Sequence, residues 1–131
     1  MDEQLYRAFA SIEDRHWWFM ARRKIVGDLI TKWIPRGSTV IDVGCGTGGF
    51  LSDLQAEYRV RGIDPSPLAL DACQARGLTA LHEGNANDAS TWGPRPVDAV
   101  TLGQLGPSIL ILAHRLLLAR RACVLCSRTF T

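Results

Sequence analysis

The sequence has no long hydrophobic run, no apolar leader and few cysteines. No stretch reaches the about 20 apolar residues that cross a bilayer, and the N-terminus, Met-Asp-Glu-Gln, lacks the apolar region of a signal peptide. We therefore expect a cytoplasmic protein without a membrane span. Cys123 and Cys126 have no second pair that would complete a zinc site, and the four cysteines show no secreted disulfide pattern. Reduced thiols and no bound metal are expected.

Acidic residues are absent from the last quarter of the chain. All 13 acidic side chains lie in residues 1–98, whereas residues 99–131 carry four arginines. The net charge of +2 is too small to indicate a nucleic-acid partner, and an apolar fraction of 47% is that of an ordinary globular protein. At 131 residues we expect one domain. We divide it into N-terminal capping helices (1–36), a cofactor-binding core (37–104) and a divergent tail (105–131).

A glycine-rich loop follows a short β-branched run near the middle of the chain. Thr39–Val43 has the composition of a strand, and apolar residues resume at helical spacing over residues 48–57. Between them lie Gly44, Gly46 and Gly48. Such a loop turns tightly and lets a ligand lie against bare backbone N–H groups at a helix N-terminus. The sequence therefore predicts a binding site for a ligand with an anionic end.

Two ligand classes agree with this loop. Gly44, Gly46 and Gly49 spell the dinucleotide fingerprint G-x-G-x-x-G, and Asp64 follows the first glycine by twenty residues, where a ribose-binding acid belongs. A nicotinamide-dependent oxidoreductase is thus one hypothesis. Asp42, however, places a carboxylate at the end of the preceding strand, which would repel a pyrophosphate but suits a cationic amino group. This residue favours a ligand that carries an amine.

The pattern Asp42-x-Gly44-x-Gly46-x-Gly48 resembles the first motif of the class I S-adenosylmethionine-dependent methyltransferases, and the resemblance covers residues 15–104. It implies S-adenosylmethionine as cofactor. The implied fold is α/β, a three-layer Rossmann-like arrangement with a mainly parallel sheet of four or five strands in the order 3-2-1-4-5. Such a sheet is incomplete relative to the seven strands of the family.

Periodicity and turn signals place the elements around this loop. Ser66 is a good helix N-cap, Pro67 suits the first helical position, and Gly77 suits the helix end. We predict helices over 2–14, 25–33, 48–57, 67–76 and 108–120, and strands over 39–43, 59–63, 78–82, 97–102 and 122–126.

The resemblance also implies roles for individual residues. Asp64, at a strand end, would accept both ribose hydroxyls, although a helix-capping acid is the alternative. Asn85 stands where the family often has an aspartate that holds adenine, with Asp88 near enough to substitute; a plain polar turn is the alternative. Gln104 falls where the family often places a polar residue facing the methyl donor. The implied cofactor-binding residues are Asp42, Gly44, Cys45, Gly46, Gly48, Asp64, Pro65, Asn85, Ala86 and Gln104.

Aromatic and basic residues alternate ahead of the loop, as His-Trp-Trp-Phe over 16–19 and Arg-Arg-Lys over 22–24. Such a segment can clamp a nucleic acid, cover a nucleoside as a lid, or anchor a helix to the core. It is similar to the capping helix of many bacterial small-molecule methyltransferases. His16, His82 and His114 are the neutral-pH bases, and His16 on this segment is the candidate general base, with a structural histidine as the alternative.

After Gln104 the resemblance fades, and the last strands of the usual sheet have no residues to form them. The fifth strand would leave an open edge and an uncovered flank. A truncated or frame-shifted product, a homodimer that buries the flank, or a minimal fold would each account for this. The resemblance implies methyl transfer to an oxygen, nitrogen or carbon of a small-molecule acceptor. The alternative is a non-catalytic module that binds S-adenosylmethionine or S-adenosylhomocysteine.

Overall fold

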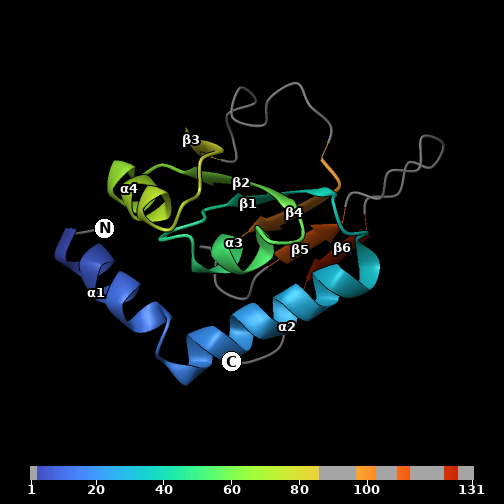
Figure 1. The fold of residues 1–131 in the computed structure, drawn as a ribbon, viewed down its shortest axis with the longest axis horizontal. Coiled ribbons are helices and arrows are strands. Elements are labelled where there is room, and N and C mark those ends of the chain that lie inside the picture. Colours follow the sequence, from blue (N-terminus) through green and yellow to red (C-terminus); the bar gives the residue numbers. More distant parts are fainter. Residues whose placement is uncertain (1–2, 86–96, 103–108, 113–122, 127–131) are drawn as a thin grey trace.

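The computed structural model describes residues 3–85, 97–102, 109–112 and 123–126, and Figure 1 shows their arrangement. The helices of this part of the chain include none that is long and apolar enough to cross a membrane. The four helices are α1 (Glu3–Glu13), α2 (Trp17–Trp33), α3 (Gly49–Leu54) and α4 (Pro67–Ala75). The six strands are β1 (Thr39–Val43), β2 (Arg59–Asp64), β3 (Leu81–Glu83), β4 (Ala99–Leu102), β5 (Ile109–Leu112) and β6 (Cys123–Cys126).

The strands form one sheet in the order β3-β2-β1-β4-β5-β6. The strands β3, β2, β1 and β4 are parallel, which confirms the predicted 3-2-1-4 order of a Rossmann-like fold. Register places Asp42 of β1 opposite Gly62 of β2 on one side and Thr101 of β4 on the other. The carboxyl ends of these neighbouring strands therefore meet at one edge of the sheet, where open α/β sheets bind ligands.

The prediction was wrong beyond β4. The segment 108–120 was expected to be helical, but Ile109–Leu112 is a strand, β5, which pairs antiparallel with β4. The predicted fifth strand is present as β6, yet it pairs antiparallel with β5 and does not lie beside β4. A short apolar run such as Ile-Leu-Ile-Leu cannot be assigned to strand or helix by periodicity, and an open edge on β4 offers it a partner. The rest of the predicted helix lies outside the described residues.

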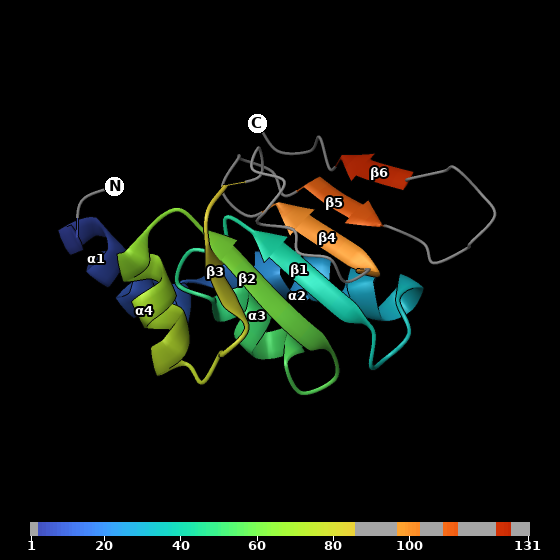
Figure 2. The same cartoon turned by 90° about the horizontal axis from the view of Figure 1, so that it is seen from above.

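The helices α2 and α3 cover one face of the sheet, and Figure 2 shows them behind the strands. They bury one hydrophobic cluster against β1 and β4, while β1, β2 and β4 bury another on the opposite face. The helix predicted over 108–120 is replaced by β5 over residues 109–112, and its other residues lie outside the described part of the chain. The first cluster comprises Ile30, Ile34, Val40, Leu54, Tyr58 and Ala99, and the second Ile41, Val43, Ile63 and Val100.

Local signals explain where the helices begin and end. Ser66 accepts a hydrogen bond from the Ala69 N–H at 3.4 Å, and Pro67 opens α4, as predicted. The helix α2 begins at Trp17, earlier than its apolar stripe suggested, and ends at Trp33 before Pro35. The aromatic and basic residues are therefore the first turns of this helix.

Candidate functional site

The glycine loop joins β1 to α3 and folds over the end of β2. The Gly44 and Cys45 N–H groups both donate to the Ile63 carbonyl, at 2.7 and 3.1 Å. The backbone has positive φ at Gly44 (73°), Gly46 (55°) and Gly48 (80°). Three left-handed residues in five produce the tight turn that the sequence predicted.

Gly46 and Gly48 are glycine for different reasons. A Cβ on Gly48 would lie 2.7 Å from the Cys73 Sγ and 2.8 Å from the Leu78 Cδ1, so this glycine permits the loop to pack on α4. A Cβ on Gly46 would meet nothing within 4 Å. The backbone of Gly46 is therefore bordered by open space, where a ligand can approach it.

Asp42 is buried on β1 directly beside the loop. Its Oδ1 accepts a hydrogen bond from the Thr101 hydroxyl at 2.6 Å, and the side chain is 4% exposed. Burial raises the pKa of Asp42 to about 7, against the opposing effects of the Thr101 hydrogen bond and the positive charge of Arg22 on α2. The site thus contains a carboxyl group that changes charge near neutral pH, with a guanidinium within electrostatic reach.

Asp64 is fully buried at the end of β2. Its Oδ2 accepts from the Gly46 N–H and its Oδ1 from the Ser66 N–H, both at 2.9 Å. The carboxylate therefore fastens the glycine loop to the N-terminus of α4. Its bond at the start of this helix agrees with the capping alternative, whereas its bond to the Gly46 N–H was not predicted. Each carboxylate oxygen has two lone pairs, so these two bonds do not prevent Asp64 from accepting further hydrogen bonds. The ribose role of Asp64 stays a prediction.

The other predicted residues differ in where the structure places them. Cys45 is buried in the loop, Pro65 is exposed between β2 and α4, and Asn85 is exposed just after β3. Ala86 and Gln104 lie outside the described residues, as does Asp88. The structure thus brings together Asp42, Gly44, Cys45, Gly46, Gly48 and Asp64.

His16, the candidate base, is the N-cap of α2. Its Nδ1 accepts from the Trp18 N–H at 3.3 Å, and its ring stacks on Trp17. His82 is exposed on β3, and His114 lies outside the described residues. A catalytic role for His16 stays a prediction, beside a capping role that the geometry explains.

The aromatic segment is only partly an anchor. Phe19 packs edge to face against Phe9 of α1, with ring centroids 6.0 Å apart. Trp17 and Trp18, in contrast, are 71% and 45% exposed. The two tryptophans are therefore not core residues, and the lid and nucleic-acid hypotheses for this segment stay predictions.

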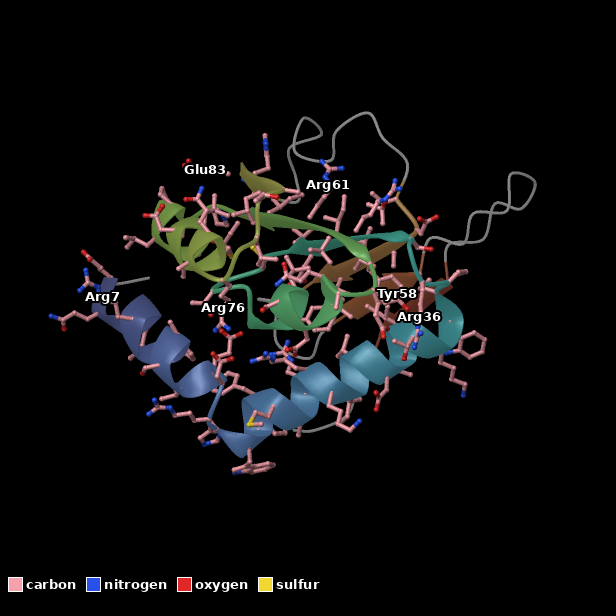
Figure 3. The ribbon with its side chains drawn as sticks, viewed as in Figure 1. Arg7, Arg36, Tyr58, Arg61, Arg76 and Glu83 are labelled. Carbon is pink, nitrogen blue, oxygen red and sulfur yellow. The ribbon has the colours of Figure 1, made fainter. Side chains whose placement is uncertain are left out.

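An ion-pair network that the sequence analysis missed joins the end of α1 to the glycine loop. The Thr47 hydroxyl donates to Glu13, and the Arg76 Nε donates to the Thr47 carbonyl at 2.9 Å. Arg76 also pairs with Glu13 at 3.2 Å and with Asp14 at 3.0 Å. Figure 3 shows Arg76 between α4 and the end of α1. No pattern in the sequence signals these contacts, because their partners are 29 to 63 residues apart.

Arg23 extends the network to α3. Its Nε and Nη2 bind both oxygens of Asp53, at 2.8 and 2.7 Å, and its Nη1 lies 2.7 Å from Asp14. Hydrogen bonds from Arg23 and Arg76 lower the pKa of Asp14. In the described part of the chain no group of three His, Cys, Asp or Glu side chains has the arrangement of a metal site.

Comparison with known proteins agrees with this geometry. A family model described as methionine biosynthesis protein MetW matches residues 26–125. No curated protein matches the chain.

Several solved structures are similar to this chain. DesVI of Streptomyces venezuelae aligns with a TM-score of 0.61 and 25% identity over 79% of this chain and 43% of DesVI. The sugar N-methyltransferase KedS8 of a Streptoalloteichus species aligns with a TM-score of 0.58 and 28% identity over 75% of this chain and 39% of KedS8. The precorrin 8W decarboxylase of Methanobacterium thermoautotrophicum aligns with a TM-score of 0.55 and 31% identity over 65% of this chain and 48% of that protein. The chain spans less than half the length of each.

Proposed function

The chain belongs to the family of methionine biosynthesis protein MetW and has the class I methyltransferase fold, and from this premise we propose that its glycine loop binds S-adenosylmethionine for methyl transfer to a small-molecule acceptor. One observation carries the proposal. The open backbone of Gly46 is hydrogen-bonded to the Asp64 carboxylate at the end of β2, and Asp42 lies near the end of the neighbouring strand β1, at the same carboxyl edge of the parallel sheet.

The charges beside the loop suit the amino-acid end of this cofactor. That end has an ammonium and a carboxylate group. Asp42, when ionised, offers the ammonium a partner, and Arg22 supplies positive charge within electrostatic reach of Asp42. A pyrophosphate, in contrast, would lie near two carboxylates, and the loop residues 44–48 carry no positive side chain that would balance its charge. We therefore rank a nicotinamide-dependent oxidoreductase lower.

The nucleoside end is proposed to lie along the ends of β2 and β3. Asp64 and Pro65 would lie at the ribose, and Asn85 with Ala86 at the adenine. The hydrogen bonds from Gly46 and Ser66 hold the Asp64 carboxylate rigidly at this place. A carboxylate fixed in advance by backbone donors loses little further freedom when it binds a hydroxyl.

In the proposed reaction, the bound cofactor supplies a methyl group activated by its sulfonium charge. The task of the protein is then to hold the two reactants in line and to exclude water. The Thr101 hydroxyl and the loop backbone fix Asp42 and Gly46 on the donor side. The exposed tryptophans of α2 are the proposed cover, and Gln104 is the residue proposed to face the methyl donor.

A binding module without turnover is the second candidate. It is favoured by the positions of the two candidate bases in the described segments. His16 caps α2 and His82 is exposed on β3, so neither position by itself indicates a general base. Turnover of radiolabelled S-adenosylmethionine with any acceptor from a panel of amines, alcohols and sugars would separate the two candidates.

Calorimetric titration with S-adenosylhomocysteine, with NAD titrated in parallel, tests the proposal. We expect saturable binding of S-adenosylhomocysteine and none of NAD. Binding of NAD alone, or of neither ligand by a chain that is folded by circular dichroism, would overturn the proposed function.

A further inference from the structure

Two cysteines from different elements meet beneath the glycine loop. The Cys45 Sγ in the loop lies 3.8 Å from the Cys73 Sγ on α4, although the residues are 28 positions apart in the sequence. Both thiols also face one backbone group. The Gly46 carbonyl accepts from the Cys73 Sγ at 3.2 Å and from the Cys45 Sγ at 3.9 Å. The loop, the helix and the thiols therefore form one contact.

The surroundings of the two thiols favour reaction between them. They pack with Leu51 and Leu78, and both are free thiols in this structure. Cys45 is 8% exposed, so a small reagent has a path to the pair, while Cys73 is fully buried. The hydrogen bond between them lowers the pKa of the Cys73 thiol, whereas the same bond, together with burial, raises the pKa of the Cys45 thiol. Cys73 is therefore the thiol that supplies the thiolate. A thiolate is the nucleophile in disulfide chemistry.

We propose that Cys45 and Cys73 are a modification site, at which a hydroperoxide forms a disulfide that disables the ligand loop. In the first step the Cys73 thiolate attacks the peroxide O–O bond, which breaks to give a sulfenic acid and, with the proton that the thiol has released, an alcohol, or water from hydrogen peroxide. The Cys45 thiol then attacks the sulfenic sulfur, and the S–O bond breaks as the hydroxyl leaves with the thiol proton as water. The two thiols are oxidised by two electrons, and the peroxide is reduced by two.

The effect on the loop follows from the distance. A disulfide holds its sulfurs at about 2.05 Å, so the two sulfur atoms must approach by nearly half of their present separation. Cys45 cannot move without its neighbours, because its N–H donates to the Ile63 carbonyl and the next N–H, that of Gly46, donates to Asp64. Oxidation also removes the hydrogen bond from Cys73 to the Gly46 carbonyl. We expect the backbone that meets the ligand to be displaced.

The second half of this proposal rests on the proposed function, since it requires that the loop binds a ligand. The disulfide itself does not. The experiment therefore measures disulfide formation, hydrogen exchange of the loop and ligand affinity separately.

Disulfide formation is detected by mass spectrometry in a Cys123→Ser/Cys126→Ser variant, in which Cys45 and Cys73 are the two remaining cysteines. After treatment with hydrogen peroxide and trypsin, we expect peptide 37–59 to be joined to peptide 62–76, and dithiothreitol to separate them. Cys73→Ser is the matched control, because serine keeps a donor for the Gly46 carbonyl but forms no disulfide. Absence of the joined peptides would overturn the proposal.

The loop is read by hydrogen exchange, and the ligand by calorimetry with S-adenosylhomocysteine. We expect faster exchange in peptide 37–59 after oxidation, and at least a tenfold loss of affinity that dithiothreitol reverses and that Cys73→Ser does not show. Joined peptides with unchanged exchange and affinity would overturn the switch. If the reduced chain binds no S-adenosylhomocysteine, the proposed function fails, whereas the joined peptides still decide the modification site and the exchange rate still decides whether the loop is displaced.

Discussion

The Thr101 hydroxyl on β4 donates a 2.6 Å hydrogen bond to the buried Asp42 Oδ1 on β1. This pair lies at the carboxyl edge of the sheet, and Asp42 is two positions before Gly44, the first glycine of the loop. The carboxyl group of this pair is buried from solvent at the place where we propose that an amine binds. Its properties lead directly to two predictions.

The first concerns stability. The pKa of Asp42 is raised from an ordinary 3.8 to about 7 by burial, so between these values the folded chain holds a proton that the unfolded chain has lost. Stability from this group is therefore present at low pH and declines as pH rises from about 4 to 7, on the order of 1 kcal/mol per pH unit. Urea unfolding at pH 5 and 7 should show that the free energy of unfolding of Asp42→Asn, relative to that of the parent chain, is higher at pH 7 than at pH 5. Parallel pH profiles would contradict the buried carboxyl.

The second concerns affinity. If an ionised Asp42 pairs with the ligand ammonium, binding of S-adenosylhomocysteine should strengthen from pH 5.5 to 7, by up to about tenfold per pH unit. Asp42→Asn should bind more weakly and with little pH dependence over that range. Calorimetry in two buffers of different ionisation enthalpy would also detect the released proton. A variant with the pH dependence of the parent chain would exclude Asp42 from the contact.

Asp64 provides the third prediction. Loss of the charge-assisted hydrogen bonds that we propose between Asp64 and the ribose hydroxyls costs on the order of 1.5–3 kcal/mol. Asp64→Ala should therefore weaken binding of S-adenosylhomocysteine about 10- to 150-fold. Asp64→Asn is the matched control, because it keeps one acceptor for Gly46 or Ser66. Normal affinity of an Asp64→Ala chain that is folded by circular dichroism would refute the ribose assignment.

Gly46 and Gly48 form a matched pair for the fourth prediction. Gly48→Ala places a methyl group against Cys73 and Leu78, and we expect a loss of roughly 2–4 kcal/mol in unfolding free energy from overpacking and left-handed strain. The Cβ of Gly46→Val would have no neighbour within 4 Å, so this substitution carries left-handed strain at a φ of 55° without overpacking of the Cβ. We expect a smaller loss of stability than for Gly48→Ala, with most of the fold kept, while S-adenosylhomocysteine binding is lost. Urea unfolding and calorimetry on both variants test this. Unchanged affinity in Gly46→Val would show that no ligand approaches there.

Two arginines test the network at the end of α1. Arg76 is largely buried and bonds to Thr47, Glu13 and Asp14, whereas Arg7 pairs with Glu3 on the exposed side of α1 (Figure 3). Arg76→Ala should lower the unfolding free energy by on the order of 2–3 kcal/mol, because it removes the ion pairs with Glu13 and Asp14 and the hydrogen bond to the Thr47 carbonyl. Arg7→Ala should cost less than about 0.5 kcal/mol. Equal effects in urea unfolding would refute the proposed importance of the network.

Residues close in sequence predicted much of this structure. The β-branched run Thr39–Val43, the glycine loop after it, and the Ser66-Pro67 helix start are all present as predicted. These features depend on local backbone preferences, which a sequence displays directly. Helix ends were less accurate, because the periodicity of α2 gave no sign that Trp17 and its neighbours continue the helix.

The tail was predicted wrongly for a reason of a different kind. Ile109–Leu112 became a strand because β4 had an unpaired edge, and no local pattern encodes whether such an edge is available. Likewise, the sequence placed Asp64 at the ligand edge but did not show that its oxygens bind the backbone of Gly46 and Ser66. Partners of buried polar groups are chosen by the fold.

The sequence by itself determined the turn at the glycines and the two carboxylates beside it, because both depend on residue type and spacing. The parallel sheet order around β1 was implied by the resemblance to the class I methyltransferases. Only the tertiary structure decided the charge state of Asp42, the contact between Cys45 and Cys73, and the clamp of Arg76 on the loop. These depend on burial and on distances between elements far apart in the chain. Desolvation and close approach act in space, so they emerge only once the helices and strands have packed.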